Sequence, residues 1–202
     1  MEMCQKKNRN SNYLRTEVAL IDAFFSLLET KLPERITVSD LSRSSGVNTK
    51  TIYNHFPDGI EDFHRFFTEQ MCFWTKDLLR TLHPPGEPLP DDLFSRRIVH
   101  HWSTMEAPHR LDLLRTDYMI KLMDQIIQSV IDLYDLQHEG DSIASQFLAQ
   151  ARIRAYWGAV VELIYQHAAI DINAPQASAF LTVIQESLYH MHQIIYQEPE
   201  EN

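Results

Sequence analysis

The residues with the most specific chemistry in this chain lie between Ile36 and Phe56. The sequence there is ITVSDLSRSSGVNTKTIYNHF, in which two short helical stretches flank Gly46. This arrangement predicts a helix-turn-helix, whose second helix enters the DNA major groove and contacts base edges with its first residues. The second stretch combines apolar positions with polar and aromatic ones that can bind bases and phosphates. We therefore expect the chain to bind double-stranded DNA through this segment.

Helical spacing divides the second stretch into an inner and an outer side. Ile52 and Phe56 are four residues apart and, with Val47, are expected to face the two preceding helices. The remaining side chains then face outward, close to the start of the helix. Lys50 can donate to guanine O6 and N7, and Thr49 can contact a thymine methyl group or a phosphate.

Other polar residues of this segment are predicted to contact the DNA backbone. Tyr53 and His55 are expected to donate to phosphates, while Thr37 and Arg43, on the first helix, would fix the docking angle. The predicted DNA-binding residues are Thr37, Arg43, Asn48, Thr49, Lys50, Thr51, Tyr53, Asn54 and His55.

The distribution of charge agrees with this interpretation although the formal net charge is -10. Residues 1–82 hold 11 Lys+Arg and 11 Asp+Glu, whereas residues 83–202 hold 7 and 17. Within residues 1–56 there are 8 basic and 6 acidic side chains, a net charge of +2. Because attraction to phosphate depends on the local patch, an acidic total does not exclude DNA binding.

The spacing of apolar residues predicts an all-α fold. Apolar positions recur mostly three and four residues apart, with little sustained alternation, and a chain of 202 residues can bury a substantial core. Thr37 and Asp40 form a capping-box pattern, Gly46 suits a left-handed helix end, and Asn48 suits an N-cap. The first four helices are expected over about 11–30, 37–46, 48–55 and 60–82.

The clearest loop follows these helices and contains four of the nine prolines, within residues 83–90. The stripe Val18, Ile21, Phe25 and Leu28 predicts the buried side of the first helix. Further helices are expected over roughly 91–106, 109–115, 117–137, 142–171 and 175–197. We place one domain at residues 1–60 and a second, helical domain at 61–202.

Several other classes of protein are not supported by the sequence. No run of eighteen or more apolar residues indicates a membrane-spanning helix, and residues 1–12 lack the apolar core of a secretory signal. Cys4 and Cys72 fit neither a metal spacing nor a disulfide framework, which favours reduced thiols in a cytoplasmic protein. Neighbouring histidines such as His190 and His192 do not share a helix face, so no metal site is expected. Phosphate loops, nucleophile elbows and paired carboxylates are missing, so neither an enzyme nor a cofactor is predicted.

Residues 14–64 resemble the DNA-binding domain of the TetR family of bacterial transcriptional regulators. Thr37-Val38, Gly46, Tyr53 and His55-Phe56 fall in register with that family's pattern, and the closing Pro57-Asp58-Gly59 is also present. The resemblance implies an N-terminal three-helix domain joined by a long fourth helix to a helical ligand-binding and dimerisation domain. It also implies a regulator, most often a repressor, that binds a palindromic operator as a homodimer.

Two positions depart from the family pattern. The family often has a phosphate-binding Lys at the start of the fourth helix, where this chain has Ile60 followed by Glu61 and Asp62. Non-specific DNA affinity would then be weaker, unless the basic residues near the beginning of the chain (Lys6, Lys7 and Arg9) compensate. A solubilising tail is the alternative role for that segment. Asp22 also stands where the family usually has a small or apolar residue.

The resemblance implies partners for the second domain as well. The helices at about 142–171 and 175–197 would form a four-helix bundle with a second copy of the chain. A small, apolar or aromatic effector would bind among large, soft side chains. The alternatives are that these side chains only fill the core, or that a protein partner controls the DNA-binding domain. The predicted pocket residues are Met71, Trp74, Leu78, Trp102, Met105, Tyr118, Met119, Met123, Tyr156 and Trp157.

Overall fold

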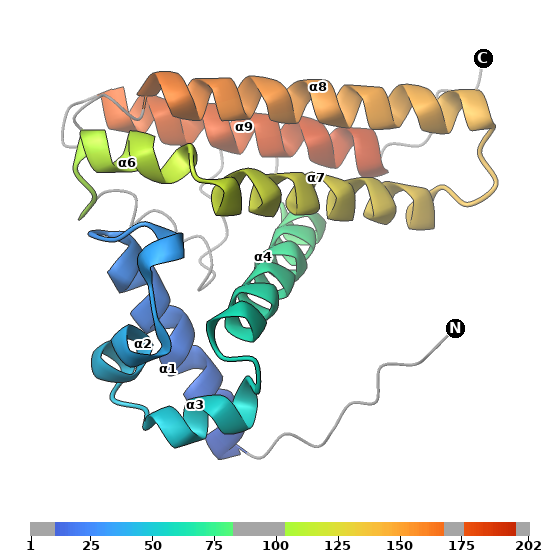
Figure 1. Ribbon diagram of the computed structural model, residues 1–202. Helices are drawn as coiled ribbons and strands as arrows, with labels where there is room; N and C mark the ends of the chain where they lie inside the picture. Colours follow the sequence, from blue (N-terminus) through green and yellow to red (C-terminus); the bar gives the residue numbers. More distant parts are fainter. Residues whose placement is uncertain (1–10, 83–103, 168–175, 197–202) are drawn as a thin grey trace. The chain divides into compact units, whose positions relative to one another are not determined.

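The computed structural model describes residues 11–82, 104–167 and 176–196 (Figure 1). This part of the chain is all-helical and contains no strand, which confirms the predicted fold class. Contacts divide the chain into two compact units, residues 1–67 and 68–202, which we describe separately. Within the described ranges, no helix is long and apolar enough to span a membrane.

The first unit consists of short helices that follow one long one. Helix α1 spans Ser11–Leu28 and leads through a single 3-10 turn, Pro33–Arg35, into α2, which spans Val38–Ser45. Helix α3 spans Thr49–His55. Helix α4 spans Ile60–Thr81, so its first two turns belong to this unit and the remainder continues into the second. These four helices lie close to their predicted positions.

Phenylalanine rings form the core of the first unit. The ring of Phe24 on α1 lies 5.2 Å from Phe63 and 4.7 Å from Phe67, both on α4, and meets each of them edge-on. Phe56, directly after α3, contacts Phe63 edge-on at 5.4 Å. Edge-to-face pairs of this kind add stability beyond the apolar area that they bury. This aromatic cluster therefore joins α1, the end of α3 and the beginning of α4.

The buried side of α1 differs from the predicted stripe at one residue. Ile21, Phe25 and Leu28 are buried as expected, but Val18 is 41% exposed. Leu20 and Phe24, both fully buried, occupy the centre of the inner face instead. The sequence prediction therefore misplaced one edge of the buried face of α1. That face is wider than the predicted stripe and is centred on Phe24.

The second unit contains the remainder of α4 together with α6 (Ala107–Leu114), α7 (Asp117–Gln137), α8 (Ile143–His167) and α9 (Gln176–Tyr196). Helices α7, α8 and α9 pack against one another side by side (Figure 1). The helix predicted over 91–106 lies almost entirely outside the described residues.

Helix α8 presents apolar residues on two sides. Ile153, Trp157 and Val160 are buried within the unit. On the opposite side, small or apolar residues remain exposed: Ala144, Phe147, Leu148, Ala151, Ala155 and Ala159. An exposed apolar stripe that runs from residue 144 to residue 159 is unusual for a surface that faces only water.

Candidate nucleic-acid interface

The start of α2 is fixed by a complete capping box. Asp40 N–H donates to Thr37 Oγ1 (3.2 Å), and Thr37 N–H donates back to Asp40 Oδ2 (3.1 Å), as the sequence predicted. Lys31, near the start of the connection that follows α1, donates to Asp40 Oδ1 at 2.7 Å. The hydrogen bonds from Lys31 and Thr37 lower the pKa of Asp40 to about 2. Asp40 therefore carries a negative charge at neutral pH and ties the end of α1 to α2.

A tight turn joins α2 to α3. Gly46 has φ 72°, the left-handed conformation that glycine adopts without strain, and it closes α2 as predicted. The hydroxyl of Ser42 donates to the carbonyl of Val47 at 2.7 Å, and Val47 N–H donates to Ser45 Oγ at 3.1 Å. These bonds satisfy backbone groups that the turn leaves without helical partners. These hydrogen bonds and the turn at Gly46 thus fix the position of α3 relative to α2.

Helix α3 separates its residues into an inner and an outer face. Asn48 caps the helix by accepting from Lys50 N–H at 2.8 Å, as predicted. Ile52 is fully buried and Phe56 is 5% exposed, so both face the core. Four of the predicted DNA-binding residues share the exposed outer face: Thr49, Lys50, Tyr53 and Asn54.

Tyr53 is exposed but does not project freely. Its ring lies beside Gly59, where an added Cβ would stand 3.2 Å from Tyr53 Cε1 and 3.3 Å from Val38 Cγ2. Gly59 has φ 68°, so any side chain there would also strain the backbone. The contact holds the Tyr53 ring along the turn between α3 and α4. The sequence pattern predicted that Tyr53 faces outward, but it did not predict that the ring lies beside Gly59.

The other end of α3 is covered by α1. The rings of Tyr13 and His55 stack with their centroids 3.8 Å apart and an angle of 21° between their planes. Tyr13 and His55 are both half-buried. This contact brings the beginning of α1 against the last residue of α3. His55, which we predicted as a phosphate donor, also has a packing role.

The remaining predicted residues lie around this face with less exposure or with intramolecular partners. The Thr37 hydroxyl and the Asn48 side chain both take part in capping. Arg43 is exposed and its Nη1 lies 3.7 Å from Asp40 Oδ1, while Thr51 is half-buried. Thr37, Arg43 and Asn48 thus position the helices as well as flank the outer face of α3.

The beginning of α4 carries acidic groups. Asp58 N–H donates to Asp62 Oδ2 at 2.8 Å, and Asp62 also forms an ion pair with Arg65. Glu61 is exposed, and Ile60, which stands where the family often has a Lys, is half-buried. The N-terminus of a helix attracts anions. Here the molecule's own carboxylate occupies that position, so this helix end offers little to a phosphate.

The residues predicted to form an effector pocket differ in burial. Met71, Leu78, Met105 and Trp157 are buried, and Tyr156 is 38% exposed. The other described members are half-buried: Trp74, Tyr118, Met119 and Met123. Trp102 lies outside the described residues. All these described residues except Met105 lie on α4, α7 and α8.

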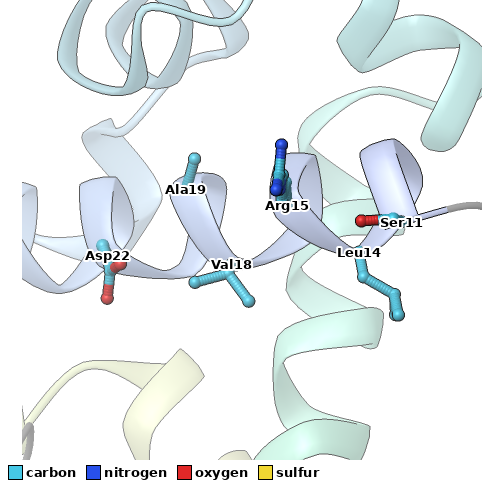
Figure 2. Close-up of a pocket in the computed structure, with 6 residues that line it drawn as sticks. All are labelled: Ser11, Leu14, Arg15, Val18, Ala19 and Asp22. Atoms are coloured by element: carbon cyan, nitrogen blue, oxygen red, sulfur yellow. The ribbon is translucent and has the colours of Figure 1, made fainter.

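A shallow, open surface hollow of about 560 Å³ is found elsewhere, along α1. Its lining consists of Ser11, Leu14, Arg15, Val18, Ala19 and Asp22 (Figure 2). Leu14, Val18 and Asp22 extend from the same side of the helix in this view. No residue of the predicted pocket contributes to it. Among the described side chains, no group of three His, Cys, Asp or Glu could hold a metal ion.

The fold and the interface together describe an all-helical protein with a helix-turn-helix unit. No family model matches the chain, and no curated protein matches it in sequence. Among solved structures, the chain is similar to the crystal structure of the TetR family repressor AlkX from Dietzia sp. strain DQ12-45-1b, which is implicated in the biodegradation of n-alkanes. The two are 18% identical, with 88% of this chain and 97% of that chain covered and a TM-score of 0.41. We therefore base the functional proposal on the residues of this chain.

Proposed function

We propose that the protein is a DNA-binding transcriptional regulator of the TetR type that inserts α3 into the major groove. The observation that carries this proposal is the division of α3. Its apolar residues are buried in the aromatic core, whereas Thr49, Lys50, Tyr53 and Asn54 are exposed together. A polar, exposed helix face on a rigidly packed helix-turn-helix suits contact with base edges.

The outer face of α3 supplies two kinds of contact. Thr49 and Lys50 occupy the first turn, where a recognition helix meets the bases, and Lys50 carries a positive charge. Tyr53 lies one turn later, and its ring contact with Gly59 limits the motion of its hydroxyl. A hydroxyl held in this way can donate to a phosphate and set the register of the helix on DNA.

We further propose that two copies of the chain pair through α8 and α9 and bind a palindromic operator. One seven-residue recognition helix provides few base contacts, and two-fold pairing doubles them. The exposed apolar side of α8 supports this arrangement, because small residues such as Ala151 and Ala155 permit close approach of a second helix. The two recognition helices would then lie about 34–36 Å apart, one turn of DNA.

Control by a small effector is the finer part of the proposal. The indole Nε1–H of Trp157 is buried, and it meets no hydrogen-bond acceptor among the residues described. An unsatisfied buried donor costs roughly 1–3 kcal/mol. An apolar or aromatic molecule carrying one acceptor would satisfy Trp157 and would stabilise whichever conformation it binds better. Regulators that are controlled in this way are most often repressors, and we propose that this one acts on DNA in the cytoplasm.

The DNA-binding proposal is tested with the double variant Lys50→Ala, Tyr53→Ala. Both side chains are exposed, but Tyr53→Ala also removes the ring that lies beside Gly59, so circular dichroism melting first verifies that the variant folds. The folded variant should lose specific binding to the duplex upstream of the protein's own gene. The measurement is a gel-shift titration at several salt concentrations. Glu69→Ala, an exposed residue of α4 in the second unit, is the matched surface control. Unchanged affinity and an unchanged salt dependence in the double variant would disprove the assigned face.

Effector control is tested separately by thermal shift and by Trp157→Phe. A ligand that binds the folded state must raise the apparent stability. A screen of apolar and aromatic compounds that carry a hydrogen-bond acceptor should therefore give compounds that stabilise the wild-type protein. Trp157→Phe keeps an aromatic ring but lacks the N–H donor, so it should reduce this stabilisation. If no compound stabilises the wild-type protein, a partner-controlled regulator without a small effector becomes the preferred interpretation.

A further inference from the structure

The hollow along α1 is a surface of the helix-turn-helix unit to which the proposed function assigns no role. Its lining runs from Ser11 to Asp22 on one helix (Figure 2). Two of the side chains that line it are apolar and exposed, Leu14 at 47% and Val18 at 41%. Neighbouring exposed apolar side chains, unlike scattered ones, mark a surface that another molecule covers.

The two charges of the hollow have opposite signs and lie symmetrically about its centre. Arg15 and Asp22 are both exposed and stand seven residues apart. Seven residues are nearly two full turns, so both side chains lie on the same side of α1. The midpoint between them falls between Val18 and Ala19. A two-fold axis through this midpoint would place Arg15 of one copy opposite Asp22 of an antiparallel second copy, and the same pair would form twice.

Both charged groups can take part in such a pair. Arg15 has no ion-pair partner among the residues that the structure describes. A carboxylate accepts several hydrogen bonds at once, so Asp22 can accept from the guanidinium of a second copy in addition to its interactions within its own chain. The small side chains of Ser11 and Ala19 permit close approach of a second helix. The occupant that fits this face in charge is therefore the same face of another copy.

The size of the face decides when the contact forms. It is about 17 Å long and about 10 Å wide, so two copies would bury on the order of a few hundred Å² in total. Stable complexes bury at least about 1,200 Å². The contact is therefore too small to hold two free copies together, but it adds to binding when DNA already holds them side by side.

We propose that α1 packs antiparallel against α1 of a second copy bound at the neighbouring DNA site, with Arg15 and Asp22 paired across the two-fold axis. This inference rests on the proposed DNA-binding function and adds cooperativity to it. The surface is separate from the one proposed for pairing through α8 and α9, so it links one pair of chains to the next along DNA. Binding of one pair then favours binding of its neighbour by the free energy of the α1 contact.

The experiment compares binding to a duplex that carries the protein's own upstream site once with binding to duplexes that carry it twice. The spacer between the two sites increases by one base pair at a time over a full turn of DNA, about 10–10.5 base pairs, so that every relative orientation of two neighbours is sampled. Gel-shift titrations give the ratio of the affinity per site on the two-site duplex to that on the one-site duplex.

Five full-length proteins are compared, and circular dichroism melting verifies that they fold alike. They are wild type, Arg15→Asp, Asp22→Arg, the double variant Arg15→Asp, Asp22→Arg, and the control Lys121→Asp. Lys121 is exposed on α7, and its replacement changes the total charge by as much as Arg15→Asp does.

For at least one spacer, wild type should bind the two-site duplex at least about fivefold more tightly per site. Each single reversal places like charges opposite each other, so the ratio should fall to about one. The double variant restores opposite charges in exchanged positions and should regain the wild-type ratio, which Lys121→Asp should keep throughout. Affinity for the one-site duplex is a separate readout, because it should change in opposite directions in the two single variants, as the total charge does.

Three results would overturn the proposal while leaving DNA binding intact. They are a wild-type ratio of about one at every spacer, a wild-type ratio in either single variant, and a folded double variant that does not recover the ratio. Ultracentrifugation without DNA should give all variants the wild-type mass, and a lower mass in Arg15→Asp would also contradict the proposal, because it would assign Arg15 to the pairing interface in solution. A wild-type protein that does not bind the one-site duplex would overturn the proposed function itself, and this inference with it.

Discussion

Asp40 joins three groups at the beginning of the helix-turn-helix. It accepts from the backbone and the hydroxyl of Thr37 and from the ammonium of Lys31. The contact with Thr37 was predictable from sequence, because a capping box has a fixed spacing of three residues. The contact with Lys31 was not, since it depends on how the connection after α1 folds back. Local patterns thus identified Thr37 as a partner of this carboxylate but did not identify Lys31.

The pKa of Asp40 leads to a prediction about acid stability. The folded-state pKa of about 2 lies below the ordinary value of 3.8, so the unfolded chain takes up the proton first. The stabilising contribution of Asp40 is therefore complete above about pH 5 and is lost as pH falls through 3.8 toward 2. Asp40→Asn should lower the free energy of unfolding at pH 7 by roughly 1–3 kcal/mol and reduce the drop between pH 7 and pH 3.

Urea denaturation followed by circular dichroism at the two pH values measures this difference. Glu61→Gln, an exposed carboxylate of the same unit, serves as the control and should change the stability little. Equal acid sensitivity in wild type and Asp40→Asn would contradict the assigned role of the carboxylate.

At the scale of the element, α3 is too short to be stable alone. It has seven residues, whereas isolated helices shorter than about 12–15 residues are marginal in water. Its helical conformation therefore depends on the Asn48 cap, on burial of Ile52 and Phe56, and on the stack between Tyr13 and His55. Both ends of the helix are fixed by contacts that a short helix cannot supply itself.

We predict that Tyr13→Ala loosens the C-terminal end of α3. Loss of the stacked ring should cost roughly 0.5–1.5 kcal/mol beyond the lost burial. It should raise the rate of amide hydrogen exchange over residues 53–56 and weaken DNA binding several-fold, whereas Tyr13→Phe keeps the ring and should match wild type. Hydrogen exchange followed by mass spectrometry measures the first effect. Unchanged exchange in Tyr13→Ala would show that α3 does not depend on α1 at this end.

The helix-turn-helix could be predicted from sequence because the residues that define it act locally. The caps at Thr37 and Asn48 and the glycine at 46 each act within a few residues. The Tyr13–His55 stack and the Tyr53–Gly59 contact join separate elements, so no periodicity could identify them. Val18 illustrates the same limit, since a regular spacing indicates a stripe but leaves its edges undefined.

At the scale of the whole molecule, α8 carries an exposed apolar face that no described residue of the chain covers. Its inner side is buried by Ile153 and Trp157, yet its outer side exposes Phe147 at 72% and Leu148 at 51%. Sequence analysis identified the length of this helix, but apolar residues on both sides obscured which of them face the core. A second copy of the chain is the proposed cover for the outer side.

We predict that Ala151→Glu with Ala155→Glu converts the dimer to a monomer. Two carboxylates on the small-residue side would prevent close approach and would be costly to bury without partners. Analytical ultracentrifugation measures the change in mass, and the monomer should bind a palindromic duplex much more weakly than wild type. Gln125→Glu, an exposed position on α7, should remain dimeric. A wild-type protein that sediments as a monomer at micromolar concentration would refute the pairing.

The division of α3 also has an evolutionary consequence. The side chains that stabilise the helix and the side chains that face outward are different residues, so Thr49, Lys50 and Asn54 are free to mutate at little cost in folding. Relatives that arise by gene duplication could acquire new target sequences by changing these three positions alone. Tyr53 is the exception, because its ring fills the space that Gly59 leaves. Across such a set of paralogues, we expect diversity at 49, 50 and 54 and constancy at 53 and 59.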